Sequence, residues 1–148
     1  MKTLGRSDKG DFPLLKLKNL KIKMDTGAYT SSIHCQDIKE VEIEEKTQLQ
    51  FKLLDPSHPK FNNKLLTFSD YETKEIKSSF GDVEERYVIK TIIVLFSTEY
   101  TIELSLSNRN DMKFPVLIGR KFLNKIFVVD TSLKNLSFET KQLSKEKK

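Results

Sequence analysis

Short runs in which apolar and polar residues alternate constrain this chain most, because that period is typical of β-strands with one buried face. The clearest run, residues 20–24, alternates apolar residues with lysines and ends at Asp25. Residues 15–17 alternate in a different phase. The segment 15–24 therefore forms either two strands that meet at a turn or one strand with a bulge. In both cases Asp25 lies at a strand end.

The remaining pattern predicts a mainly β chain. Further apolar or alternating runs occupy residues 49–53, 88–96, 100–106, 114–118 and 127–129. The segment 88–106 reads as a hairpin, and residues 136–138 are a candidate last strand. The polar segment 37–45 is compatible with a short helical turn or an edge strand. The clearest helix covers residues 120–125, directly after Gly119.

Length and composition set limits on the class of protein. The 148 residues suit one domain with a hydrophobic core. A single cysteine, Cys35, excludes an intrachain disulfide. The amino terminus lacks the apolar core of a secretory signal, and the longest apolar run, residues 92–96, is too short to span a membrane. We therefore expect a cytoplasmic protein that does not act at a membrane.

The net charge gives little support for nucleic-acid binding. Residues 139–148 are rich in lysine and are expected to form a basic, flexible tail, which leaves 1–138 as the single domain. Without the last eight residues the formal net charge falls from +5 to about +2, and no arginine-rich or aromatic-interleaved stripe is present.

The sequence Asp25-Thr26-Gly27 is the first chemically informative motif. A carboxylate at a strand end, followed by a glycine that permits close backbone approach, is a plausible catalytic feature. A turn aspartate at a strand end is the simpler alternative, and the motif alone is too short to decide. A second stretch, residues 116–123, has an apolar pair followed by Gly119 and Arg120, about ninety residues after the first.

Together, these motifs resemble the pattern of retropepsins, the aspartic proteases typified by retroviral enzymes. Five segments carry the resemblance in order: Gly5–Arg6, Met24–His34, Glu85–Thr91, Glu103–Arg109 and Val116–Arg120. The set is similar to a bacterial retropepsin-like aspartic endopeptidase family often labelled "ATP-dependent zinc protease" and discussed alongside ATP-grasp glutamate ligases. The similarity extends from about Gly5 to Asp130.

The resemblance implies a closed, six-stranded-type acid-protease barrel over residues 1–138, with one short helix after Gly119. It also implies a homodimer in which Asp25, Thr26 and Gly27 of each subunit meet at a two-fold axis. Two adjacent carboxylates share a proton, so one activates water while the other polarises the peptide carbonyl. Residues 70–86 occupy the place of the flap, a lid over an extended peptide; a long surface loop is the alternative.

Other positions are expected to bind substrate or support the site: Ala28, Thr30, Ser31, His34, Gly119 and Arg120. In retroviral relatives this arginine pairs with an acid at the position of Tyr29, so its partner here is open. Thr26 is expected to contact the partner subunit.

Metal and nucleotide sites receive little support from the residues. The two histidines, His34 and His58, belong to no His-Glu-x-x-His or paired-cysteine motif, so His34 is expected to form hydrogen bonds and no metal is assigned. The chain has no Gly-rich phosphate loop, so no cofactor is expected and any link to ATP would run through a partner. Asp130-Thr131-Ser132 lacks the glycine and is expected to form a strand-end turn.

Three functions follow in order of preference. The first is an aspartic endopeptidase that cleaves an extended peptide, with an acidic or glutamylated peptide as the candidate substrate. The second is a non-catalytic retropepsin-like module that binds peptides and works with an ATP-grasp ligase. The third is a zinc hydrolase.

Overall fold

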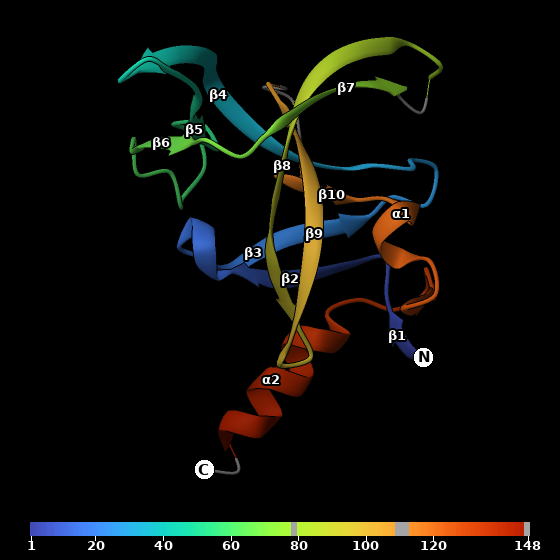
Figure 1. Cartoon of the computed structure of the whole chain (residues 1–148). Coiled ribbons are helices and arrows are strands. Elements are labelled where there is room, and N and C mark those ends of the chain that lie inside the picture. Colours follow the sequence, from blue (N-terminus) through green and yellow to red (C-terminus); the bar gives the residue numbers. More distant parts are fainter. Residues whose placement is uncertain (78–79, 109–112, 147–148) are drawn as a thin grey trace.

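The computed structural model describes residues 1–77, 80–108 and 113–146, most of them in strands (Figure 1). The elements in chain order are β1 (Lys2–Leu4), β2 (Ser7–Phe12), a 3-10 turn η1 (Pro13–Leu15), β3 (Leu17–Met24), β4 (Ser31–Ile43), β5 (Lys46–Leu53), β6 (Leu65–Phe68), β7 (Glu72–Lys77), β8 (Val83–Leu95), β9 (Thr98–Ser107), β10 (Val116–Ile118), α1 (Arg120–Leu123), β11 (Phe127–Val129) and α2 (Leu136–Glu146).

The strand pairings give the chain a ring-like arrangement. They run from β10 through β3, β2, β8, β9 and β4, and β4 pairs again with β10. The link between β2 and β8 is narrow, because these two strands share a single pair of Cα partners, Asp11 and Val94. A small parallel sheet of β1 and β11 lies beside the ring. The mainly β class predicted from the alternation is confirmed.

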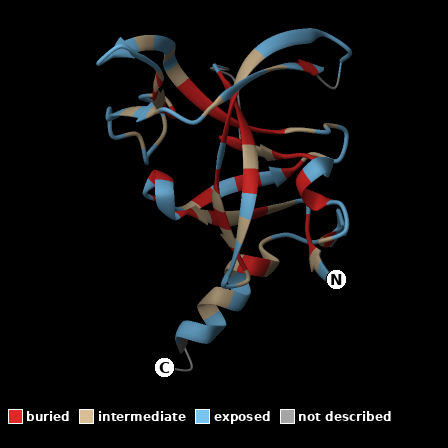
Figure 2. Ribbon diagram, in the orientation of Figure 1, coloured by how far each residue is buried: buried red, intermediate tan, exposed pale blue. Residues whose placement is uncertain are grey.

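Two arms leave the ring at the top of Figure 1. One consists of the outer half of β4 with β5 and β6, and the other of β7 with the first half of β8. Both long strands are buried near the ring and exposed further out (Figure 2). The polar segment 37–45 is therefore a strand, and Asp37 bends it with a φ of 54° where the register shifts.

The alternating run at residues 20–24 is a strand with one buried face, as predicted. In β3 the side chains of Leu20, Ile22 and Met24 are buried, while Lys21 and Lys23 are exposed. Of the two alternatives for residues 15–24, the structure has one continuous strand, preceded by η1 and distorted at Asn19, whose φ is 51°. The buried face of β3 lies against the rest of the core, and its end delivers Asp25 to the surface.

Two helices follow Gly119 rather than one. The short helix after Gly119 is confirmed as α1, but the candidate strand at residues 136–138 is wrong because α2 begins there. Residues 139–146, assigned above to the tail, lie in this helix, which points away from the sheets in Figure 1. In the part of the chain that is described, no helix is long and apolar enough to cross a membrane.

A distant carboxylate explains why α2 forms. Asp8 of β2 accepts hydrogen bonds from the backbone N–H groups of Ser137 (2.9 Å) and Phe138 (3.1 Å). These N–H groups lie in the first turn of α2, where a helix has no internal acceptors for them. Lys141 adds an ion pair with Asp11 at 2.9 Å. Burial raises the pKa of Asp8. The hydrogen bonds that its carboxylate accepts from the N–H groups of Ser137, Lys9 and Phe138 partly oppose this effect.

Candidate active site

Asp25 is positioned by a strand inserted from the other end of the chain. Strand β10 lies parallel to β3, with Ile118 opposite Met24, and antiparallel to β4, with Val116 opposite Ile33. It therefore joins the two strands that flank the Asp25 loop. The loop begins with a hydrogen bond from the Asp25 N–H to the carbonyl oxygen of Ile118, 2.8 Å long.

The start of α1 holds the far side of the same loop. The backbone N–H of Arg120 donates to the carbonyl oxygen of Ala28 at 2.9 Å, and that of Lys121 donates to Tyr29 at 2.8 Å. The N–H of Gly119 donates to the hydroxyl of buried Ser31, also at 2.9 Å. These bonds fix the loop mainly through backbone groups.

Gly119 is required by close backbone approach. A Cβ placed on it would lie 2.5 Å from the carbonyl oxygens of both Tyr29 and Thr30. No side chain can occupy that position unless the loop moves. The glycine predicted to support the site therefore lets β10 and the Asp25 loop come into direct contact.

Within the described residues, Arg120 contacts the loop and pairs with no acidic side chain. Its Nη1 donates to the carbonyl oxygen of Thr26 at 2.9 Å, and its guanidinium lies over the ring of Tyr29, 5.8 Å from the ring centroid. An aromatic face attracts a guanidinium through its quadrupole. Tyr29, at the position where the resemblance to retroviral proteases would place an acid, thus contacts Arg120 through its ring.

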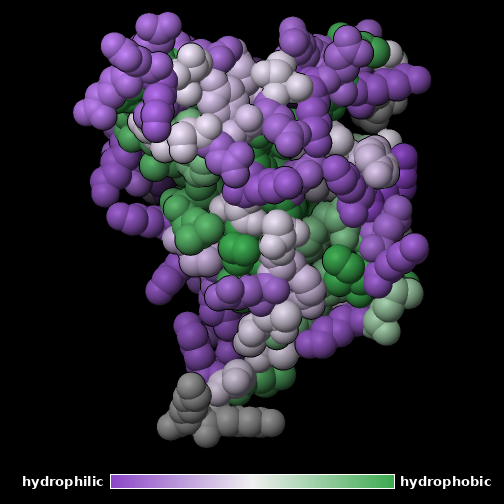
Figure 3. Space-filling model, in the orientation of Figure 1, coloured by the Kyte–Doolittle hydropathy of each residue, from purple (hydrophilic) through white to green (hydrophobic). Residues whose placement is uncertain are grey.

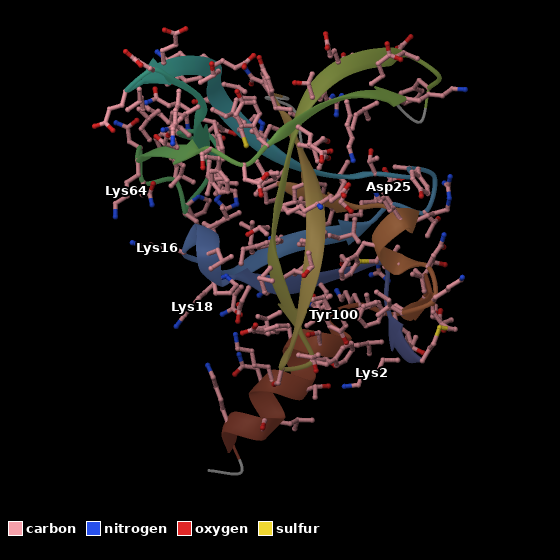
Figure 4. All side chains as sticks on the ribbon, viewed as in Figure 1. Lys2, Lys16, Lys18, Asp25, Lys64 and Tyr100 are labelled. Carbon is pink, nitrogen blue, oxygen red and sulfur yellow. The ribbon has the colours of Figure 1, made fainter. Side chains whose placement is uncertain are left out.

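The carboxylate of Asp25 is half-buried and lies at an accessible edge. Its Oδ1 accepts a hydrogen bond from the N–H of Gly27 at 3.2 Å, and Thr26 and Gly27 are both exposed. A Cβ on Gly27 would meet only Asp25 Oδ1, at 3.4 Å, so the space around this glycine is open. Figure 4 shows Asp25 beside α1 and below the β7–β8 arm, on the side of the molecule away from Lys16 and Lys18.

Asp130 is part of a turn in the other sheet. It follows β11, and its Oδ1 accepts from the N–H and the hydroxyl of Ser132, at 2.9 and 2.6 Å. The same bonds lower the pKa of Asp130, with the hydroxyl contributing most. The prediction of a strand-end turn is confirmed.

His34 forms a buried bridge between segments. Its side chain is 3% exposed, its Nδ1 lies 3.2 Å from the carbonyl oxygen of Ser107, and its Nε2 lies 2.8 Å from Asp55 Oδ2. The hydroxyl and N–H of Ser57 lower the pKa of Asp55, and His34 adds a smaller effect. Next to it, Cys35 is fully buried, and burial raises the pKa of its thiol, which argues against a nucleophile.

The described ranges contain no cluster of three or more His, Cys, Asp or Glu side chains that could hold a metal ion. The hydrogen-bonding role predicted for His34 is what its contacts show.

A cleft of about 490 Å³ lies next to the Asp25 loop. Tyr29, Thr30 and Ser31 line one side of it, and Ile76 and Val88 of the β7–β8 arm line the other. The predicted flap region is thus a hairpin at the edge of a cleft, with residues 78–79 outside the described part of the chain. Hydrophilic residues cover both arms in Figure 3.

Sequence reasoning missed the charged residues of this cleft. They are Lys74 and Glu75 of β7, Lys90 of β8, Glu103 of β9 and Lys121 of α1. Only the strand pairing brings them together, so no sequence motif marks them.

Comparisons with known proteins agree with this geometry. A model of the family described as "RimB-like: Retropepsin-like aspartic endopeptidase RimB" matches residues 4–140. A crystal structure of a Legionella pneumophila protein of unknown function superposes with a TM-score of 0.70 and 25% identity, covering 92% of this chain and 98% of that one.

Curated relatives carry a different name and are much longer. A "probable alpha-L-glutamate ligase" of Shewanella halifaxensis is 34% identical over 125 residues, which are 82% of this chain and 26% of that protein. One of the same name from Desulfotalea psychrophila is 31% identical over 136 residues, 89% of this chain and 28% of that protein. The chain therefore spans about a quarter of the length of these relatives.

Proposed function

The chain belongs to the RimB-like family of retropepsin-like aspartic endopeptidases, and we propose that it is a peptidase whose active site is completed by a second copy of the chain. The observation that carries the proposal is the Asp25 loop. Backbone bonds from β10 and α1 hold it rigidly, while Thr26 and Gly27 are exposed and the space beside Gly27 is open.

One Asp-Thr-Gly per chain makes the second copy necessary. An aspartic peptidase needs two carboxylates close together, because like charges at short range share one proton instead of both ionising. A two-fold axis beside Gly27 would place two Asp25 side chains in this relation, each loop filling the open space of the other. We also propose that the ring of strands is the closed barrel of an acid protease.

The chemistry then follows from the shared proton. The ionised Asp25 takes a proton from a bound water, and the water oxygen attacks the peptide carbonyl carbon. The protonated Asp25 of the other copy donates a hydrogen bond to the carbonyl oxygen, which stabilises the charge that develops on it. When the tetrahedral intermediate collapses, the C–N bond breaks and the leaving amine takes the proton that Asp25 removed from the water. The β7–β8 arm is the proposed lid that excludes water from the cleft.

We propose an acidic or glutamylated peptide as the substrate class and the cytoplasm as the place of action. The names of the relatives support the first point, because a ligase that adds glutamate would produce such peptides.

A second function is favoured by one observation. The segment similar to this chain is only about a quarter of proteins named as probable glutamate ligases. This arrangement suits a module that binds glutamate-rich peptides for an ATP-grasp ligase without cleaving them.

Replacement of the carboxylate tests the first proposal. Asp25→Asn should lower the cleavage rate of quenched-fluorescent, glutamate-rich peptides by at least about a hundredfold, because it removes the general base. Asp130→Asn is the matched control: it alters the other Asp-Thr dipeptide and leaves an amide oxygen to accept from Ser132. Full cleavage by Asp25→Asn would refute the mechanism that uses Asp25, and peptide binding by the wild-type chain with no cleavage would favour the binding module.

A further inference from the structure

We infer that the cleft beside the Asp25 loop is a subsite for a carboxylate-bearing side chain of the substrate, with Lys90 as its ligand and Glu103 as a built-in competitor. The inference rests on the proposed function, because it takes the cleft to be part of the peptide-binding site. It adds the residues that would select the substrate.

The floor of the cleft suits an aliphatic stem. Ile76, Val88, Ile102 and Phe122 line it, and each is at most 6% exposed. Apolar contacts of this kind favour the methylene groups of a side chain. A glutamate side chain has such a stem and carries its charge at the far end.

The lining of the cleft carries one positive charge more than negative charges: the ammonium groups of Lys74, Lys90 and Lys121 and the carboxylates of Glu75 and Glu103. Outside this lining, the carboxylate of Glu72 also pairs with Lys74, at 3.3 Å. Long lysine side chains can lay their stems on apolar surface and present the charge to a ligand. This distribution attracts an anionic group more than a neutral one.

Glu103 already occupies the place of an anionic ligand. A single oxygen, Oε2, lies 2.8 Å from Lys121 Nζ and 3.3 Å from Lys74 Nζ. Hydrogen bonds from Lys121 and Lys74 lower the pKa of Glu103, so its carboxylate is ionised at neutral pH. The chain therefore neutralises two of its lysines with one internal carboxylate.

Lys90 is the lysine left for the substrate. It lies directly across from Glu103 in the β8–β9 pairing. Yet the carboxylate of Glu103 is paired with the other two lysines, and within the described residues Lys90 has no ion pair. A bound carboxylate would thus lie near all three ammonium groups, in competition with Glu103.

The cleft is suitably placed for this role. Its wall is formed by Tyr29, Thr30 and Ser31, the residues that end the Asp25 loop. Backbone bonds from Gly119 and Lys121 fix these residues relative to Asp25. A peptide at Asp25 can therefore place a neighbouring side chain in the cleft.

Binding of labelled peptides to the Asp25→Asn protein tests the inference. We expect hexaglutamate to bind more tightly than hexaglutamine, and the preference to weaken as salt screens the charges. Lys90→Gln should reduce hexaglutamate affinity about three- to tenfold, the effect of one charge-assisted contact at a partly exposed site. Glu103→Gln should raise that affinity about threefold or more, since it removes the competitor.

Lys18→Gln is the matched control, because it removes the same charge on the side of the molecule away from Asp25 (Figure 4). An equal loss in Lys18→Gln and Lys90→Gln would mean unspecific attraction and would overturn the subsite, as would a Glu103→Gln protein with unchanged or weaker affinity. Selective binding without cleavage by the wild-type chain would instead refute only the peptidase. Equal rates of cleavage of glutamate-rich peptides by the wild-type chain and by Lys90→Gln would refute only the subsite.

Discussion

Asp25 and His34, nine residues apart, are held in different ways. Backbone groups of Ile118 and Gly27 surround Asp25, whereas the ring of His34 is fixed by Asp55 and by the carbonyl oxygen of Ser107. A bond between a buried histidine and a carboxylate depends on the charge of that carboxylate. The second arrangement is therefore sensitive to acid.

We expect Asp55→Asn to remove part of the acid sensitivity of the fold. Ser57, and to a smaller extent His34, holds the pKa of Asp55 below its usual value of 3.8. Ionised Asp55 therefore stabilises the fold above that value, and the stabilisation is lost as the pH falls through the lower folded pKa. The wild-type chain should be the more stable at pH 6, and its advantage should shrink toward about pH 3 in urea-unfolding series. Asp70→Asn, which alters an exposed aspartate, is the control; an advantage independent of pH would contradict the assignment.

Single residues of the site were predictable only in part. Asp25 lies at the end of β3 as its alternation indicated, and the hydroxyl of Ser31 accepts a hydrogen bond from Gly119. The contact between Arg120 and the ring of Tyr29 was not predictable, because the motif contains the arginine but does not show which side chain it contacts.

The junction of β10 and α1 supports the site, and Gly119 lies at this junction. Comparison of alanine substitutions at Gly119 and at Gly27 distinguishes a loss of stability from a loss of activity. Gly119→Ala should lower the free energy of unfolding by roughly 3 kcal/mol, because its Cβ would collide with two carbonyl oxygens. Gly27→Ala should change that free energy by less than about 0.5 kcal/mol, since its Cβ meets only Asp25 Oδ1 at 3.4 Å.

If two copies meet at Gly27, the alanine there should nonetheless reduce peptide cleavage. Urea unfolding and cleavage assays of the two variants give a two-way comparison. A strongly destabilised Gly27→Ala protein, or a stable Gly119→Ala protein, would contradict this account.

Other elements escaped prediction for identifiable reasons. The hairpin predicted over residues 88–106 is present as β8 and β9. The tight turn between β4 and β5 was not predicted: it passes through Glu44 and Glu45, both with positive φ, and has no glycine or asparagine of the kind that marks such turns. The β7–β8 arm is mostly exposed, so its strands have no apolar alternation to reveal them. The first turn of α2 is held by Asp8, more than a hundred residues earlier, a contact that the local sequence does not reveal.

At the scale of the whole molecule, the ring, its arms and the open edge at Gly27 describe half of a proposed active site. Because the proposed site needs one Asp25 from each of two chains, a single subunit should be inactive. Activity should also fall more steeply than protein concentration on dilution, because the pair dissociates.

Mixing subunits tests this expectation. With equal amounts of wild-type and Asp25→Asn chains allowed to exchange, about a quarter of the pairs are fully wild-type. At constant total protein we therefore expect about a quarter of the wild-type activity, compared with half if each chain works alone. Asp130→Asn chains in the same mixture should leave the activity unchanged, and a half-maximal result with Asp25→Asn would exclude the paired site.

The insertion of β10 between β3 and β4 also has a consequence for synthesis. The bonds that hold the Asp25 loop come from residues 118–121, whereas the loop itself spans residues 25–31. A ribosome makes the loop first, so a nascent chain carries its acidic motif for some ninety residues without the strand that orders it. Closing so long a loop costs entropy that only the finished strand pairing offsets. The carboxylate therefore acquires its geometry only after residues 116–121 have been made, and no product that ends before residue 116 can hold it in this way.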